Sequence, residues 1–240
     1  MKYAIIADIH ANLEALEVVL DDIKAQGCSK VVCLGDVVGY NANPKECLDI
    51  IRGMDITCVK GNHDEYCSSE VGLEGFNPHA EEAIQWTREQ LTENDRQWLR
   101  DLKYIRMLSS FTLVHATLDG PQRWGYVFDK LAAAASFTYQ NTSVCFFGHT
   151  HVPLAFVRDT KVGGGTYSKF RTEPGKKYFI NVGSVGQSRD GVAKATYVVY
   201  NMAESSIELR RLDYDMATTQ KKILDAGLPS RLAERLAEGR

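Results

Sequence analysis

Carboxylate, amide and imidazole side chains recur directly after short apolar runs of this chain. The runs AIIA, VVCL, TCVK, FTLV and VCFF each end in such residues. The residues at these ends are Asp8 and His10; Gly35 and Asp36; the GNHD motif, Gly61 to Asp64; His115; and the GHTH motif, Gly148 to His151. Oxygen and imidazole ligands of this kind, without a clear thiolate, suit Mn, Fe, Zn, Co or Ni.

The number of candidate ligands indicates more than one metal ion. Two Asp, one Asn and four His make up the set, which is Asp8, His10, Asp36, Asn62, His115, His149 and His151. This exceeds the needs of one tetrahedral ion and suits two ions that share a bridging carboxylate. Residues two apart, as in the first and last motifs, point to the same side of an extended segment, so each pair could chelate one ion or serve two neighbouring ions.

Each motif alone also has an ordinary structural explanation. Gly-Asp and Gly-Asn are common turn signals, and a single histidine after a strand is usually a hydrogen-bonded loop residue. The joint placement favours metal binding, because five of the six histidines fall in these motifs. The sixth, His79, follows Asn77 and Pro78, and we expect it on the surface of a first helical turn.

The elements that must position these residues alternate between strands and helices, which predicts an α/β fold with a parallel core. Nearly continuous apolar runs predict strands covered on both faces. We expect strands at 2–7, 30–34, 56–60, 111–115, 143–147, 177–182, 195–201 and 206–212. We expect helices at 13–26, 44–53, 79–91, 94–102 and 130–137, and two more within 215–238. The glycines at 163–165 predict a hairpin turn.

Composition narrows the class of protein further. The chain has 240 residues, a formal net charge of -3 and no basic stripe, which argues against binding to a nucleic-acid backbone. No apolar run reaches the roughly 20 residues of a membrane helix, and the N-terminus lacks a signal peptide. The six cysteines form no C-x-x-C pair and fit small buried residues in a reducing compartment. We therefore expect one cytoplasmic domain over residues 1–240.

The motifs D-x-H, G-D, G-N-H-D, a strand-end H and G-H-T-H, in this order, resemble the calcineurin-like metallophosphoesterase superfamily. The stretches GDVVGYNANPKEC, FNPHAEEAIQWT and NVGSVGQSRDG are similar to a bacterial and archaeal subgroup of predicted phosphodiesterases. The resemblance implies a four-layer α/β/β/α sandwich of two mixed sheets. One departure is Ala11, where the family motif has glycine; alanine fits there if its φ angle is negative.

The resemblance also implies a dinuclear site. Asp8, His10 and His151 would hold one ion, Asn62, His115 and His149 the other, and Asp36 would bridge them. Two such ions polarise phosphoryl oxygens and lower the pKa of a bridging water, and the resulting hydroxide attacks phosphorus in line with the leaving oxygen.

Further residues receive roles around this site. His63 would act as a general acid or stabilise developing charge, and Asp64 would orient its imidazole. Arg189 is a candidate phosphate-binding cation, with a surface loop arginine as the alternative. Tyr40 and Asn41 could line the pocket.

The leading function is hydrolysis of small phosphate-ester substrates, as a phosphodiesterase. Activity like that of a diadenosine tetraphosphatase or of a serine/threonine protein phosphatase remains an alternative, as does a metal-binding scaffold without catalysis. Retention of every ligand and of His63 with Asp64 argues against the scaffold. We expect residues 65–107 to shape the substrate pocket, but the sequence leaves the substrate open.

Overall fold

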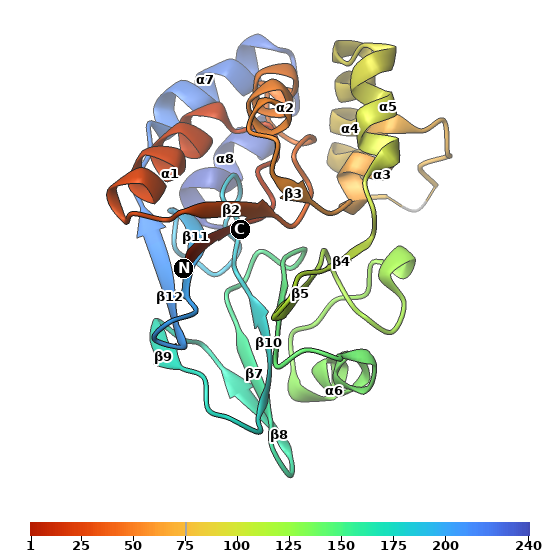
Figure 1. Cartoon of the computed structure of the whole chain (residues 1–240). Coiled ribbons are helices and arrows are strands. Elements are labelled where there is room, and N and C mark those ends of the chain that lie inside the picture. Colours follow the sequence, from red (N-terminus) through yellow and green to blue (C-terminus); the bar gives the residue numbers. More distant parts are fainter. Residues whose placement is uncertain (75) are drawn as a thin grey trace.

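The computed structural model describes residues 1–74 and 76–240, and two six-stranded mixed sheets face each other in it (Figure 1). The first sheet has the order β3-β2-β1-β11-β12-β9 and the second β4-β5-β6-β10-β7-β8. The strands of the first sheet are β1 (Lys2–Ile6), β2 (Lys30–Cys33), β3 (Thr57–Cys58), β9 (Lys169–Arg171), β11 (Ala195–Asn201) and β12 (Ser206–Leu212). Those of the second are β4 (Ile105–Met107), β5 (Phe111–Val114), β6 (Val144–Phe147), β7 (Ala155–Arg158), β8 (Val162–Gly165) and β10 (Lys177–Asn181).

Helices cover the outer face of each sheet. The helices are α1 (Leu13–Ala25), α2 (Pro44–Gly53), α3 (Asn62–Ser68), α4 (Pro78–Gln90), α5 (Glu93–Asp101), α6 (Lys130–Tyr139), α7 (Met216–Asp225) and α8 (Ser230–Glu238). In Figure 1, α1, α2, α7 and α8 lie above the first sheet, and α6 lies against the second. This arrangement confirms the expected α/β/β/α sandwich.

Alternation along β1 shows why its three buried residues, Ala4, Ile5 and Ile6, are all apolar. Ala4 and Ile6 pack in the cluster beneath α1 and α2, whereas Ile5 belongs to the cluster between the two sheets. Successive side chains of a strand point to opposite faces, so a strand covered on both faces has no position left for a polar residue. The cluster between the sheets also contains Phe111 and Phe146 of the second sheet.

The predicted elements are all present, with differences of a few residues. Strands β11 and β12 have the predicted limits, but only Thr57–Cys58 of the third predicted strand pairs as β3. The three glycines lie in a hairpin, as predicted, but they belong to its second strand, β8, which pairs with β7, rather than to its turn. A Cβ on Gly164 would lie 2.6 Å from the Ala155 carbonyl oxygen, so close approach of the paired backbone explains this glycine better than a turn does.

Parallel pairing brings the ends of the site-bearing strands together. β1 and β2, and β2 and β3, are parallel, as are β5 and β6 in the second sheet. Strand β1 lies between β2 and β11. The residues after β1 are also tied to a late part of the chain, because the Val185 and Gly186 amides donate to the carbonyl oxygens of Ala7 and Asp8. The carboxyl ends of strands from both sheets therefore meet around Asp8.

Candidate metal centre

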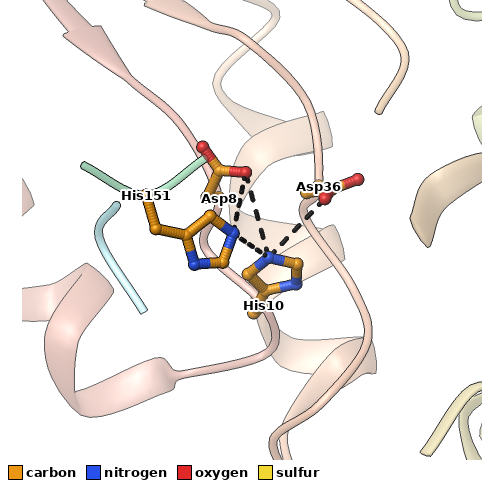
Figure 2. Close-up of side chains that lie close together, drawn as sticks. All are labelled: Asp8, His10, Asp36 and His151. Carbon is orange, nitrogen blue, oxygen red and sulfur yellow. Dashed lines mark hydrogen bonds and ion pairs between the residues drawn. The ribbon is translucent and has the colours of Figure 1, made fainter. Parts of the chain in front are cut away.

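Four buried side chains from both sheets converge in a first group, Asp8, His10, Asp36 and His151 (Figure 2). The Nε2 atoms of His10 and His151 are 3.0 Å apart. Asp8 Oδ1 lies 3.2 Å from His151 Nε2, and Asp36 Oδ2 lies 3.6 Å from His10 Nε2. One ligand atom from each residue thus faces a common point.

A second group lies next to the first and shares Asp36 with it. Asp36, His115 and His149 form this group, and Asp36 Oδ2 is 3.3 Å from His115 Nε2. Asn62 Oδ1 completes it, at 3.1 Å from His115 Nε2 and 2.9 Å from His149 Nδ1. Because Asp36 Oδ2 faces histidines of both groups, it stands where a bridging ligand would stand.

Main-chain carbonyl oxygens fix which ring nitrogen of each histidine faces the centre. An imidazole that donates its outer N–H presents a lone pair on its inner nitrogen. The outward pairs are His10 Nδ1 with Val38 O (3.2 Å), His115 Nδ1 with Leu34 O (2.8 Å), His151 Nδ1 with Gln187 O (2.6 Å) and His149 Nε2 with Trp124 O (2.9 Å). Once each inner nitrogen is free of its proton, four imidazole lone pairs, two carboxylates and one amide oxygen fit divalent transition ions.

Burial and mutual charge shift the pKa values of these groups strongly. Burial holds the pKa values of His10, His149 and His151 well below the usual range, so these rings are neutral ligands at neutral pH. Burial also raises the pKa of Asp8 to about 7. Burial opposes the charged forms of His115 and Asp36 too, but their attraction outweighs it, raises the His115 pKa to about 10 and holds the Asp36 pKa well below its usual value.

Most of the candidate ligands have left-handed backbone conformations. Their φ angles are 53° for Asp8, 48° for His10, 53° for Asp36, 66° for His149 and 58° for His151. Such angles cost L-residues about 1–2 kcal/mol each and concentrate at functional sites. Ala11 also has a positive φ of 54°, so the condition under which alanine fits there without strain is not met.

Glycine is required at two of the motifs because backbones approach closely. A Cβ on Gly148 would lie 2.3 Å from Asp8 Oδ2. Gly35 has a φ of 90°, and its Cβ would lie 2.4 Å from the Gly61 amide nitrogen. These contacts explain the Gly-His and Gly-Asp pairs of the sequence.

His63 lies beside the first group rather than within it. It is in the first turn of α3, is 3% exposed, and its ring centroid is 4.8 Å from that of His10. Burial lowers the pKa of His63 to about 4. Its Nδ1 has no hydrogen-bond partner among residues 1–74 and 76–240.

Asp64 does not orient His63, and that expectation was wrong. Its carboxylate accepts from the main-chain amides of Asp36 (2.8 Å), Val37 (2.9 Å) and Gly61 (3.0 Å). Three amide donors satisfy this buried carboxylate, which therefore fixes the loop that carries Asp36.

A cavity of about 300 Å³ opens over the centre. Arg189, Tyr40 and His63 line it. Asn41 is fully buried and donates from Nδ2 to the His10 carbonyl oxygen (2.6 Å), so the prediction that it lines the pocket was wrong.

Aromatic walls of this cavity had no signal in the sequence. Trp124 and Tyr126 line it, and the Tyr126 ring stacks on His149 at 4.4 Å between centroids. Tyr66, Phe76 and Asn77 complete this part of the wall, which agrees with the expectation that residues 65–107 shape the pocket. These side chains come from loops and helix ends, where no periodic pattern marks a residue as part of a wall.

The two-sheet α/β/β/α sandwich, with Asp, Asn and His side chains clustered where strand ends converge, defines an α/β protein with a candidate metal centre. Residues 1–205 match the family model of the calcineurin-like phosphoesterase superfamily domain, and the chain belongs to that family.

Relatives from archaea and bacteria share this fold. The chain is 38% identical to the uncharacterized protein MJ0912 of Methanocaldococcus jannaschii, over 99% of this chain and 98% of that protein. It is similar to the crystal structure of a metallophosphoesterase from Sphaerobacter thermophilus, with a TM-score of 0.89, 37% identity, and coverage of 100% and 99%. The protein PH1004 of Pyrococcus horikoshii shares the fold, with a TM-score of 0.79, 18% identity, and coverage of 100% and 98%. Within the described ranges, every helix is too short or too polar to cross a membrane.

Proposed function

We propose that this protein is a phosphodiesterase that hydrolyses small, nucleotide-type phosphate esters with two divalent metal ions. Membership of the phosphoesterase family supports the reaction class. The observation that carries the dinuclear proposal is Asp36, whose Oδ2 lies 3.6 Å from His10 Nε2 in one ligand group and 3.3 Å from His115 Nε2 in the other.

The two groups divide the proposed ligands between the ions. Asp8, His10 and His151 would hold one ion, Asn62, His115 and His149 the other, and Asp36 both. When bound, Mn, Fe, Zn, Co or Ni ions polarise phosphoryl oxygens and activate water as a nucleophile at neutral pH. The neutral imidazoles need not lose a proton before they bind, because burial already holds their pKa values low.

The chain itself supplies the groups that bind the ester and move protons. Arg189 stands on the cavity wall, where its guanidinium would bind a non-bridging phosphoryl oxygen. His63 faces the same cavity and would donate a proton to the leaving oxygen. Its low pKa in the free protein rises when an anionic phosphate enters, because a nearby negative charge favours the imidazolium. Asp64 holds the Asp36 loop in place.

The size of the cavity favours small esters over phosphoproteins. A volume of about 300 Å³ is at the lower end of small-molecule sites, and aromatic rings wall it. This supports a phosphodiesterase or an enzyme of the diadenosine tetraphosphatase type over a serine/threonine protein phosphatase. Six free cysteines, five of them buried, fit a reducing compartment, which supports a cytoplasmic location.

The proposal is tested by a screen of metal-loaded protein. Bis(p-nitrophenyl) phosphate, p-nitrophenyl phosphate, cyclic nucleotides and dinucleoside polyphosphates would each be assayed with the five metals, with Asp36→Asn as the control protein. We expect the wild type to turn over diesters faster than monoesters, and we expect no such difference for Asp36→Asn. Preferred cleavage of dinucleoside polyphosphates would support the tetraphosphatase alternative, and absence of hydrolysis with every metal would overturn the proposal.

A further inference from the structure

A second cavity adjoins the candidate active site on the side of α8. It has a volume of about 480 Å³ and shares Tyr40, Tyr126 and Arg189 with the cavity over the metal ligands. Arg231, Arg235 and Arg240, from α8 and the residues after it, add three more basic side chains to its wall. The two cavities are therefore continuous along a shared wall, and the second is much the more basic.

Among the described residues, Arg189 and Arg235 form no close ion pair with an acidic side chain. Arg231 is neutralised, because both terminal nitrogens pair with Glu238 at 2.9 and 2.8 Å. Arg235 donates only from Nε, to the Arg240 main-chain oxygen at 2.5 Å, and Arg189 donates only to Gln187 Oε1. Neither forms an ion pair with an aspartate or glutamate side chain anywhere in the part of the chain that the structure describes.

The position of Arg235 places its charge close to the reacting centre. The guanidinium carbons of Arg189 and Arg235 lie 5.6 and 5.8 Å from the Tyr40 ring centroid. The same ring is 4.3 Å from the His63 ring. The Tyr40 ring thus lies between Arg235 and His63, the residue that would protonate the leaving oxygen.

The end of α8 is held firmly against the loop that carries Arg189. The Gly191 amide donates to the Gly239 carbonyl oxygen at 3.0 Å. Gly239 ends the helix with a φ of 63°, and a Cβ there would lie 2.7 Å from the Val192 amide nitrogen. The backbones that carry the two arginines are therefore fixed relative to each other.

Two neighbouring cations in a partly buried wall repel each other unless an anion lies between them. Burial and the Arg189 charge lower the pKa of Arg235 to about 10, so the side chain remains cationic at neutral pH. A planar guanidinium with free terminal nitrogens matches the geometry of a phosphate group.

We propose that Arg235 binds a second phosphate of the substrate in this cavity, so that the substrates are phosphate esters with another phosphate group beside the scissile one. This inference rests on the proposed function. It assigns α8 a part in substrate selection, which the strand-end motifs alone do not provide.

The test uses two nitrophenyl esters that differ only in the second phosphate. Thymidine 5′-(p-nitrophenyl phosphate) and its 3′-phosphorylated analogue have the same scissile bond and leaving group. We expect wild-type protein to show a KM about tenfold lower for the 3′-phosphorylated ester, with a similar kcat, because a charge-assisted pair contributes roughly one such factor or more. Arg235→Gln should lose this preference, so that its KM is similar for the two esters.

Arg158→Gln is the matched control. Arg158 is also half-buried over an aromatic ring, with its guanidinium carbon 5.3 Å from the Phe137 centroid, but it lies on β7 and lines neither cavity. The Arg158→Gln variant should keep the lower KM for the 3′-phosphorylated ester. Arg235→Lys, which retains the charge without the planar fork, should keep part of it and guards against loss of folding in Arg235→Gln.

Calorimetry separates failure of the inference from failure of the proposed function. Thymidine 3′,5′-bisphosphate should bind metal-loaded wild type about tenfold more tightly than thymidine 5′-phosphate, and Arg235→Gln should bind both alike. If neither ester is hydrolysed, the proposed function fails. The two affinities still show whether Arg235 binds a second phosphate. Equal affinities in the wild type, or an unchanged preference in Arg235→Gln, would overturn the inference.

Discussion

At the scale of single residues, the candidate ligands follow from side-chain chemistry, whereas the roles of their neighbours depend on contacts that no local sequence pattern reveals. Every motif residue expected to ligate metal lies in one of two adjacent groups or, for Asn62, within 3.1 Å of one. Asp64 and Asn41 were misjudged, because adjacency in sequence says little about which buried amide or carbonyl a side chain reaches. The positive φ of Ala11 was also out of reach, since alanine gives no local sign of that conformation.

His63→Ala should separate catalysis from metal binding. His63 lies outside both ligand groups, so metal occupancy should survive while kcat falls by about 10²–10⁴. Nitrophenolate leaves without much protonation, whereas an alkoxide needs a proton. The loss should therefore be smaller on nitrophenyl esters than on alkyl or nucleoside esters, as measured by kcat on matched pairs. Equal loss on both would refute the acid role and leave His63 as a charge stabiliser.

Asp36→Asn should weaken both metal ions together, since one carboxylate oxygen faces both groups. Truncation of His151, which belongs only to the first group, should weaken mainly one ion. Calorimetric titration with manganese would give about two ions per chain for the wild type and a single strong site for His151→Ala. Normal binding of two ions by Asp36→Asn would disprove the bridge.

At the scale of elements, periodic apolar patterns were sufficient for the strands and helices that build the layers. The missed elements are short or edge-located: β4, β7, β8 and β9 carry few buried side chains, so no alternating pattern marks them. Helix α3 was also missed. Its first turn is the GNHD motif, whose ligand chemistry was recognised but whose glycine suggested a turn.

One side chain of α1 links that helix to the first sheet. Asp22 accepts from the Tyr197 hydroxyl of β11 at 2.7 Å and from Arg210 Nε and Nη2 of β12 at 3.0 Å each. Asp22→Asn should lower the free energy of unfolding by about 1.5–3 kcal/mol in urea denaturation. Asp21→Asn, on the same helix but with an ion pair to Lys24 that is 77% exposed, should change it by less than about 0.5 kcal/mol. Similar losses in both variants would contradict the link.

The Asp22 contribution should also depend on pH. Burial alone would raise its pKa, but hydrogen bonds from Arg210 and Tyr197 outweigh burial and lower the pKa below its usual value. A group whose pKa is depressed on folding stabilises the protein above its unfolded pKa of about 4, and this stabilisation is lost as the pH falls through the folded value. The stability difference between wild type and Asp22→Asn should therefore be constant from pH 5 to 7 and shrink below about pH 4.

At the scale of the whole molecule, the site joins the two sheets. Asp8 and Asp36 follow strands of the first sheet, and His115 and His149 follow strands of the second. The arrangement of sheets and layers could be expected from the family motifs, but the close approach of both sheet edges and the basic cavity beside α8 depend on loop paths and on packing between distant segments. Such features have no local sequence signature.

Metal loading should raise the melting temperature, because ions that bind only the folded state stabilise it by mass action. At a free metal concentration of about 100 times Kd, the gain is about 2.7 kcal/mol, or roughly 5–10 °C for a chain of this size. Differential scanning calorimetry of chelated and manganese-loaded protein would measure the shift. Asp36→Asn should show a much smaller one, and an unchanged melting temperature in the wild type would count against metal at this site.

The placement of β1 between β2 and β11 has a consequence for synthesis on the ribosome. Asp8 is made well before Ser184 and Gly186, yet its carbonyl oxygen accepts from the Gly186 amide and from the Ser184 hydroxyl, and β1 completes its pairing only with β11, Ala195–Asn201. A nascent chain that has not yet exposed these residues carries several of the candidate metal ligands without the framework that aligns them. The centre must therefore mature late in translation, and a chain terminated before β11 would leave β1 with an unpaired edge, the kind of strand that quality-control machinery recognises as misfolded.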